Sequence, residues 1–246
     1  MNLTLKPVFG LSGSALKVIA MISMVIDHVA LYLMEHGIVL YETMRCIGRI
    51  AFPVFAFLIA EGFIHTRSRY RYFFTLLGFA VISEIPWYLL NGADGTHNVM
   101  FTLALGVATL MVLENLLQRS LVLGFLWTLG MAGLASWSGV DYEWRGILLI
   151  VILYLFNRHG HSFPYSRGMQ FFCTLVLMIH YGGIGAVMAC MILYVYNGTR
   201  GFVQGSIAKY VFYAFYPVHL IVLSNFMLLP SVSYTHLRAH ETRHDL

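Results

Sequence analysis

The feature that most constrains this sequence is a succession of apolar segments separated by short polar turns. Several reach the roughly 20 residues that an α-helix needs to cross a bilayer. The expected spans are 16–35, 45–64, 72–91, 99–118, 121–137, 145–157, 169–181, 183–197 and 208–229. The pattern predicts an all-α protein, a polytopic bundle of about nine transmembrane helices. The segments 145–157 and 169–181 are short, so we expect them to be re-entrant, tilted or packed inside the bundle.

The composition supports a membrane protein. Of the 246 residues, 59% are hydrophobic and only 11% are charged, and the mean hydropathy is +0.75. A typical soluble domain has about a quarter of its residues charged. Membrane lipids are therefore expected partners and nucleic acid is not. With no internal repeat and no long linker, residues 1–230 are predicted to form a single domain.

Most basic residues fall on one side of the membrane when the expected spans are counted from the amino terminus. Only Arg45 and Arg145 fall on the far side. The basic residues on the amino-terminal side are Lys6, Lys17, Arg67, Arg69, Arg71, Arg119, Arg158, Arg167, Arg200 and Lys209. Because cytoplasmic loops are enriched in Lys and Arg, the amino terminus is predicted to be cytoplasmic.

The composition changes abruptly after Pro230. Residues 231–246 resemble the read-through of a sequencing adapter, and we expect them to be a non-native tail. His236, His240 and His244 in this tail are spaced as on one helical face and could imitate a metal site. We favour a solvated tail and expect no metal.

Asp27 and His28 stand side by side in the middle of the first apolar segment. A carboxylate in hydrocarbon is costly, so such a residue is by default a candidate functional group. Lys17 lies eleven positions before His28, which is roughly 1100° around a helix and about 16 Å along it, so the two share a face. The sequence suggests a base, His28, oriented by Asp27. The alternative is a snorkelling Lys17 and a His28 that only hydrogen-bonds between helices.

The second span and the turn after it combine several charges. Arg45 and Arg49 are one helical turn apart and can face the same partner, and Pro53 permits a kink. Glu61 lies near the cytoplasmic end of this span. The basic cluster Arg67, Arg69 and Arg71 follows, and it suits either phosphate binding or contact with anionic lipids.

Two further polar residues are predicted at a similar depth to Asp27 and His28. Glu84 precedes Pro86 in the third span and could form an ion pair with Arg49, in a structural or a catalytic role. His219, in the last span, is either a second imidazole at the site or a packing residue. The intramembrane candidates for catalysis are therefore His28, Asp27, Arg49, Glu84 and His219.

Several motifs together resemble the TraX family. They are Leu16-Lys17 through Asp27-His28, Arg45 through Pro53, Glu61-Gly62-Phe63 with His65-Thr66-Arg67, Ser83-Glu84-Ile85-Pro86, and Phe215-Tyr216-Pro217-Val218-His219-Leu220. The likeness covers residues of about 5 to 229. That family is named for the conjugal-transfer protein that acetylates the amino terminus of F-type pilin. It is similar in turn to the acyltransferase-3 class, from which this chain departs by carrying Lys17 in place of the usual Arg and Glu61 in place of Ser.

The resemblance implies a multi-pass acetyltransferase of the bacterial cytoplasmic (inner) membrane, with acetyl-CoA or another acyl-CoA as donor. His28, oriented by Asp27, would deprotonate an acceptor, and Arg49 would stabilise the oxyanion. The donor would be bound by Lys17, Glu61, Arg67, Arg69 and Arg71. The acceptor stays open among a pilin-like peptide, a glycan and a lipid.

Two other functions fit the same residues. Asp27, Glu84 and His219 could form the relay of a proton- or ion-coupled transporter, although the internal repeat of many transporters is missing. Alternatively, the polar groups could only specify helix packing in a non-catalytic membrane assembly factor.

Overall fold

The computed structural model describes residues 10–159, 165–203 and 205–241, with side chains described as far as Met227 except for Ser206. Within these ranges the chain is helical. The helices are α1 (Gly13–Leu33), α2 (Val39–Gly48), α3 (Ala51–His65), α4 (Arg69–Asn91), α5 (Val99–Arg119), α6 (Leu121–Trp137), α7 (Glu143–His159), α8 (Ser166–Met178), η2 (Ile179–Tyr181), α9 (Gly183–Tyr194) and α10 (Ser206–Glu241). The non-native tail expected at 231–246 lies outside the part of the chain whose side chains are described.

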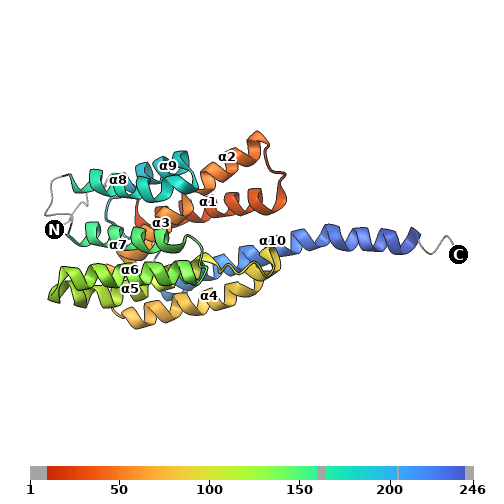
Figure 1. Cartoon of the computed structure of the whole chain (residues 1–246). Helices are drawn as coiled ribbons and strands as arrows, with labels where there is room; N and C mark the ends of the chain where they lie inside the picture. Colours follow the sequence, from red (N-terminus) through yellow and green to blue (C-terminus); the bar gives the residue numbers. More distant parts are fainter. Residues whose placement is uncertain (1–9, 160–164, 204, 242–246) are drawn as a thin grey trace.

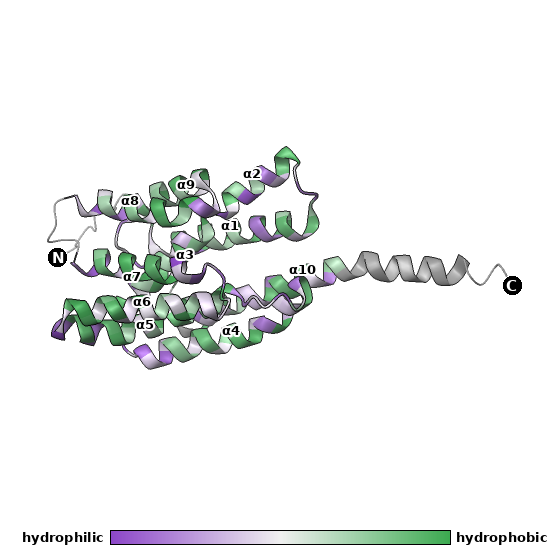
Figure 2. Ribbon diagram, viewed as in Figure 1, coloured by the Kyte–Doolittle hydropathy of each residue, from purple (hydrophilic) through white to green (hydrophobic). Residues whose placement is uncertain are grey.

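The helices form a bundle in which successive crossings run in opposite directions (Figure 1). Among the described residues, five segments are long and apolar enough to cross a membrane, namely Gly13–Leu33, Val39–His65, Arg69–Asn91, Val99–Arg119 and Ile207–Met227. Hydrophobic residues dominate these helices, as the green ribbon of Figure 2 shows. The all-helical polytopic architecture predicted from the sequence agrees with this arrangement.

The expected span 45–64 lies within the segment Val39–His65, which is long and apolar enough to cross a membrane. This segment is formed by α2 and α3 rather than by one continuous helix, with the interruption at Arg49 and Ile50. In a continuous helix the ring of Pro53 would clash with the carbonyl group of Arg49, four residues earlier. In the first turn of α3 that clash is absent. The interruption therefore follows from Pro53, and it places Arg49 at a junction between two helices.

Of the two short segments, α7 is packed inside the bundle. Ile147, Leu149, Ile150 and Leu153 are fully buried, because α3, α5, α6 and α8 all pack against this helix. Gly106 of α5 makes room for it: a Cβ atom there would overlap the side chain of Ile150. The central position of α7 explains why the middle of this 17-residue helix, residues 147–156, is an unbroken run of apolar and aromatic residues.

Two sets of loop contacts tie the ends of the bundle together. At the end where α1 begins, the amide groups of Leu11 and Gly13 donate to the carbonyl groups of Val195 and Thr199 over 2.9 and 2.8 Å. At the opposite end, the loops before α5 and α7 pair through His97 and Val140. Both ends are thus fixed by backbone hydrogen bonds between segments distant in the sequence.

Candidate functional site

Two imidazoles meet where α1 packs against α10. Nδ1 of His28 lies 2.7 Å from Nε2 of His219, and the rings are nearly parallel, with centroids 5.0 Å apart. His219 is buried, with 8% of its surface exposed. Because ring nitrogens at this distance share a proton, the two residues form one polar unit.

A backbone carbonyl group determines which ring nitrogens of this pair carry protons. Nδ1 of His219 lies 3.1 Å from the carbonyl oxygen of Phe215, which can only accept a hydrogen bond, so this nitrogen carries the proton. In a neutral pair, Nε2 of His219 is then an acceptor and Nδ1 of His28 donates to it. The proton of His28 is thereby placed on Nδ1, and its Nε2 is left with a free lone pair.

Lys17 lies on the same side of α1 as His28, as the spacing predicts. Its Nζ is 5.5 Å from the centroid of the Phe212 ring on α10. Phe212 and His219 are both on α10, so Lys17 and His28 face the same neighbouring helix. The shared face of Lys17 and His28 is confirmed.

Asp27 faces away from the histidine pair and toward α2. Its Oδ2 lies 2.7 Å from a guanidinium nitrogen of Arg45. Gly48 is needed for this approach, because a Cβ atom at position 48 would overlap the carboxylate of Asp27. His28 is therefore oriented by the hydrogen bond that it donates to His219, whereas Asp27 links α1 to α2.

Arg49, at the junction of α2 and α3, faces the hydroxyl group of Tyr142 and the carboxylates of Asp27 and Asp141. Tyr142 has a φ of +63°, a backbone conformation that residues other than Gly rarely adopt. Its ring stacks on Phe52 with centroids 3.6 Å apart. Strained backbone of this kind persists only where its surroundings fix it, and here it holds a tyrosine beside Arg49.

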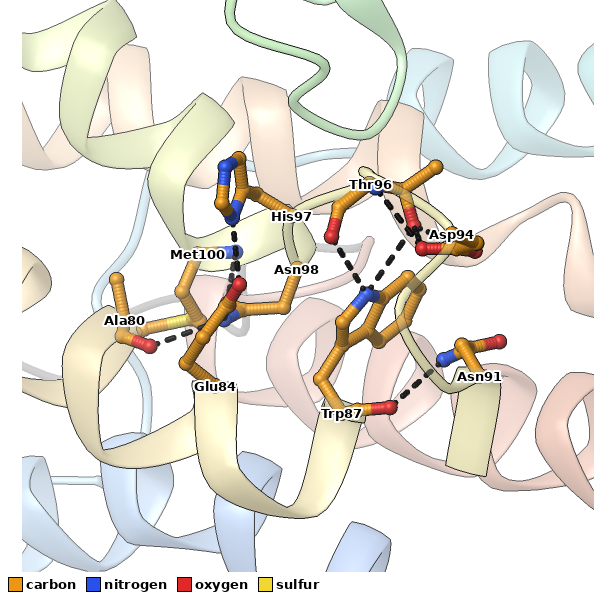
Figure 3. A network of polar contacts seen from close by, with 9 residues as sticks. All are labelled: Ala80, Glu84, Trp87, Asn91, Asp94, Thr96, His97, Asn98 and Met100. Carbon is orange, nitrogen blue, oxygen red and sulfur yellow. Dashed lines mark hydrogen bonds and ion pairs between the residues drawn. The ribbon is translucent and has the colours of Figure 1, made fainter. Parts of the chain in front are cut away.

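Glu84 belongs to a different cluster, at the junction of α4 and α5 (Figure 3). One carboxylate oxygen lies 2.5 Å from Nδ1 of His97, and the other accepts a 2.6 Å hydrogen bond from Asn98. Asn98 also donates to the carbonyl group of Ala80 and caps α5 by accepting from the amide of Met100. The expected ion pair between Arg49 and Glu84 is thus replaced by a clamp that joins α4 to α5.

The residues expected to bind the donor do not converge on one place. Arg69 is paired with Glu114 and lies over the ring of Phe63, so its charge is already compensated. Arg67 and Arg71 are exposed at the turn between α3 and α4. Glu61 faces α7 and α9, where it accepts 3.2 Å hydrogen bonds from Asn157 and Tyr196.

Two tyrosines at the histidine pair were missed in the sequence. The ring centroids of Tyr32 and Tyr216 lie 5.8 and 6.4 Å from that of His28, and Tyr216 is buried. Their spacing was an available signal, because Tyr32 follows His28 by four positions and Tyr216 precedes His219 by three, which places each pair on one helical face.

Comparisons with known proteins give a consistent result. The family described as "TraX protein" matches residues 12–227. The chain is 32% identical over 235 residues to the "Probable fimbrial assembly protein FimC, serogroup H1" of Dichelobacter nodosus, covering 86% of this chain and 94% of that protein. It is also 32% identical over 142 residues to an uncharacterized protein of Rickettsia prowazekii (strain Madrid E), covering 57% of this chain and 52% of that protein. No solved structure matches.

Proposed function

This chain belongs to the TraX family, and on that premise we propose that it is an integral-membrane acetyltransferase. It would transfer an acetyl group from acetyl-CoA to an amine or hydroxyl acceptor, with a pilin-like peptide as the first candidate. The observation that carries the proposal is the hydrogen bond between His28 and His219. It leaves Nε2 of His28 unprotonated inside the membrane, as a general base requires.

In the reaction we propose, the acceptor nitrogen or oxygen attacks the thioester carbonyl carbon while Nε2 of His28 takes its proton. The bond from acceptor to carbon forms, the bond from carbon to sulfur breaks, and the thiolate of coenzyme A leaves with that proton. The oxyanion formed on the way needs a positive group, and Arg45 and Arg49 are the cations whose charges act on His28. Such stabilisation is worth about 3–4 kcal/mol in known enzymes.

The test is acetyl transfer in membranes that contain the chain. Labelled acetyl-CoA is supplied with an envelope fraction that contains pilin, and the acetylated products are separated. We expect His28→Ala to lower the rate by about 10²–10⁴-fold at equal protein abundance. His159→Ala, an exposed histidine at the end of α7, is the matched control. Full activity of the His28→Ala protein would show that His28 is not the catalytic base.

A second candidate is a non-catalytic role in the assembly of surface fibres. It is favoured by the structural pairing of Asp27 with Arg45 and of Arg69 with Glu114, which gives these polar groups a packing function. The same assay separates the two. Loss of fibres on deletion of the chain, without acetyl transfer by the wild-type protein, would favour assembly.

A further inference from the structure

A large cavity lies away from the histidine pair, between α3, α7, α8 and α9. Its volume is about 680 Å³, within the range of about 300–1,000 Å³ that is typical of small-molecule sites. Glu61, Asn157, Arg167 and Tyr196 line it. They come from the ends of α3, α7 and α9 and the start of α8, at the end of the bundle where α1 begins (Figure 1). This is the end predicted to face the cytoplasm, where acyl-CoA is found.

The walls of the cavity are rich in aromatic rings. Phe57, Phe156, Phe171 and Tyr194 line it, and the edge of Phe57 meets the ring of Tyr196 with centroids 5.1 Å apart. The amide side chains of Asn157 and Gln170 lie among them. Aromatic faces stack on planar bases, and amide side chains match the donor and acceptor pattern of a purine edge. This combination suits a heteroaromatic base better than an acyl chain.

Thr174, in the wall of the cavity, has a buried hydroxyl group. Thr174 is 1% exposed, and its hydroxyl oxygen makes no hydrogen bond within the described part of the chain. A buried hydroxyl without a partner costs about 1–3 kcal/mol, so a bound ligand that pairs with it would recover this energy. The carboxylate of Glu61 in the same cavity can accept hydrogen bonds from hydroxyl groups, such as those of a ribose.

The start of α8 adds an anion-binding element. This helix has 13 residues, and no side chain of the described residues caps its first turn. Ser166 and Arg167 of that turn line the cavity, and the guanidinium of Arg167 lies 5.8 Å from the centroid of the Tyr194 ring. Free amide groups at a helix start bind phosphate, and a guanidinium pairs with it through two hydrogen bonds.

We propose that this cavity binds the nucleotide of the acyl donor, with the purine between the aromatic walls and a phosphate at Arg167 and the start of α8. The assignment rests on the proposed acetyl transfer for the identity of the donor. It moves the donor site away from the basic cluster Arg67, Arg69 and Arg71. Thr174 and Glu61 would hydrogen-bond the base and the ribose.

The test is the binding of adenosine 3′,5′-bisphosphate, the nucleotide of coenzyme A without its reactive arm, to the purified full chain in detergent. We expect Arg167→Gln to weaken binding about tenfold, the value of one charge-assisted hydrogen bond, and Thr174→Val to weaken it by about threefold. Arg119→Gln, an exposed arginine at the same end of the bundle, should bind as the wild type does. Absence of nucleotide binding by the folded wild-type protein would overturn the proposal, as would equal losses in the Arg167 and Arg119 variants.

A lipid phosphate could use the same groups, and a competition experiment separates the two sources. If the nucleotide is the ligand, phosphatidylglycerol in the micelle should leave its affinity unchanged; phosphatidylglycerol binding that depends on Arg167, without nucleotide binding, would overturn the proposal. The two proposals also fail in different ways. Nucleotide binding without acetyl transfer would refute the proposed acetyltransferase activity and leave the nucleotide site standing. Acetyl transfer by the Arg167→Gln variant with an unchanged KM for acetyl-CoA would refute the nucleotide site.

Discussion

At the scale of single residues, two side chains that are adjacent in the sequence have different partners. His28 contacts His219 over 2.7 Å, a distance that depends on how α1 packs against α10. Asp27 pairs instead with Arg45, because consecutive residues on a helix point about 100° apart.

The role of His219 can be tested by replacing the atom that it presents. His219→Phe removes the acceptor for Nδ1 of His28, so we expect acetyl transfer to fall about tenfold to a hundredfold through loss of ring orientation. His219→Gln places an amide oxygen close to the position of Nε2 and should retain more activity. Initial rates at equal abundance measure both variants, and equal rates for the two would argue against an orienting hydrogen bond.

Gly48 is predicted to be intolerant of even one methyl group. In Gly48→Ala the new Cβ would overlap the carboxylate of Asp27, so α1 and α2 must separate, at a cost of about 1–3 kcal/mol. Gly130→Ala in α6 is the control, because nothing lies within 4 Å of its Cβ position and Ala favours a helix. Thermal unfolding in detergent should show a lower Tm for the first variant only.

Asp141 is expected to make stability depend on pH. Burial raises the pKa of this loop residue to about 6, against the lowering effects of the Tyr142 amide and Arg49. The folded protein thus binds the proton more tightly than the unfolded chain, so stability falls as pH rises from about 4 to about 6. The loss from this group is of the order of 3 kcal/mol. Asp141→Asn should abolish that part of the pH dependence in denaturant unfolding, and an unchanged profile would contradict the assignment.

At the scale of helices, sequence patterns predicted the elements well and their interruptions poorly. The run 45–64 lies within one segment that is long and apolar enough to span a membrane, and that overall pattern hides the break at Arg49 and Ile50. Pro53 was the available signal, but a proline can kink a membrane helix without ending it. The partner of Glu84 was also missed, because His97 and Asn98 follow a turn whose path cannot be read from spacing alone.

The clamp between α4 and α5 gives a prediction at this scale. Asn98→Asp keeps the oxygen that caps α5 but replaces the donor to Glu84 by a second carboxylate. We expect a loss of about 1–3 kcal/mol at pH 7 from the lost hydrogen bonds and the facing charges. Denaturant unfolding curves of the variant and the wild-type protein at pH 7 test this, and equal stability of the two would contradict the clamp.

At the scale of the whole molecule, the alternation of helix direction gathers the basic turns at one end. Arg67 and Arg200 lie in the connections after α3 and α9. Arg119 ends α5 and Arg167 lies in the first turn of α8, and all four are at the end where α1 begins. The sequence could predict this arrangement, because a wrong number of spans would have placed basic residues on both sides of the membrane. It could not reveal the cavity at that end, since its walls come from four helices.

The predicted orientation can be tested by labelling single cysteines. In a background with Cys46, Cys173 and Cys190 replaced by Ala, Val39→Cys at the start of α2 should react with an impermeant maleimide in intact cells. Arg119→Cys, at the opposite end of the bundle, should react only after lysis. Both native side chains are exposed, so accessibility reports sidedness, and the reverse pattern would place the amino terminus outside.

The series of hydrogen bonds from His28 to His219 ends on the main-chain carbonyl group of Phe215. No substitution of the side chain at position 215 removes that oxygen, because every amino acid supplies one. Within this hydrogen-bonded series, a mutational scan should therefore detect two sensitive positions, 28 and 219, where a side-chain triad would give three. An inventory of invariant residues across relatives would likewise register the histidines and overlook the third participant.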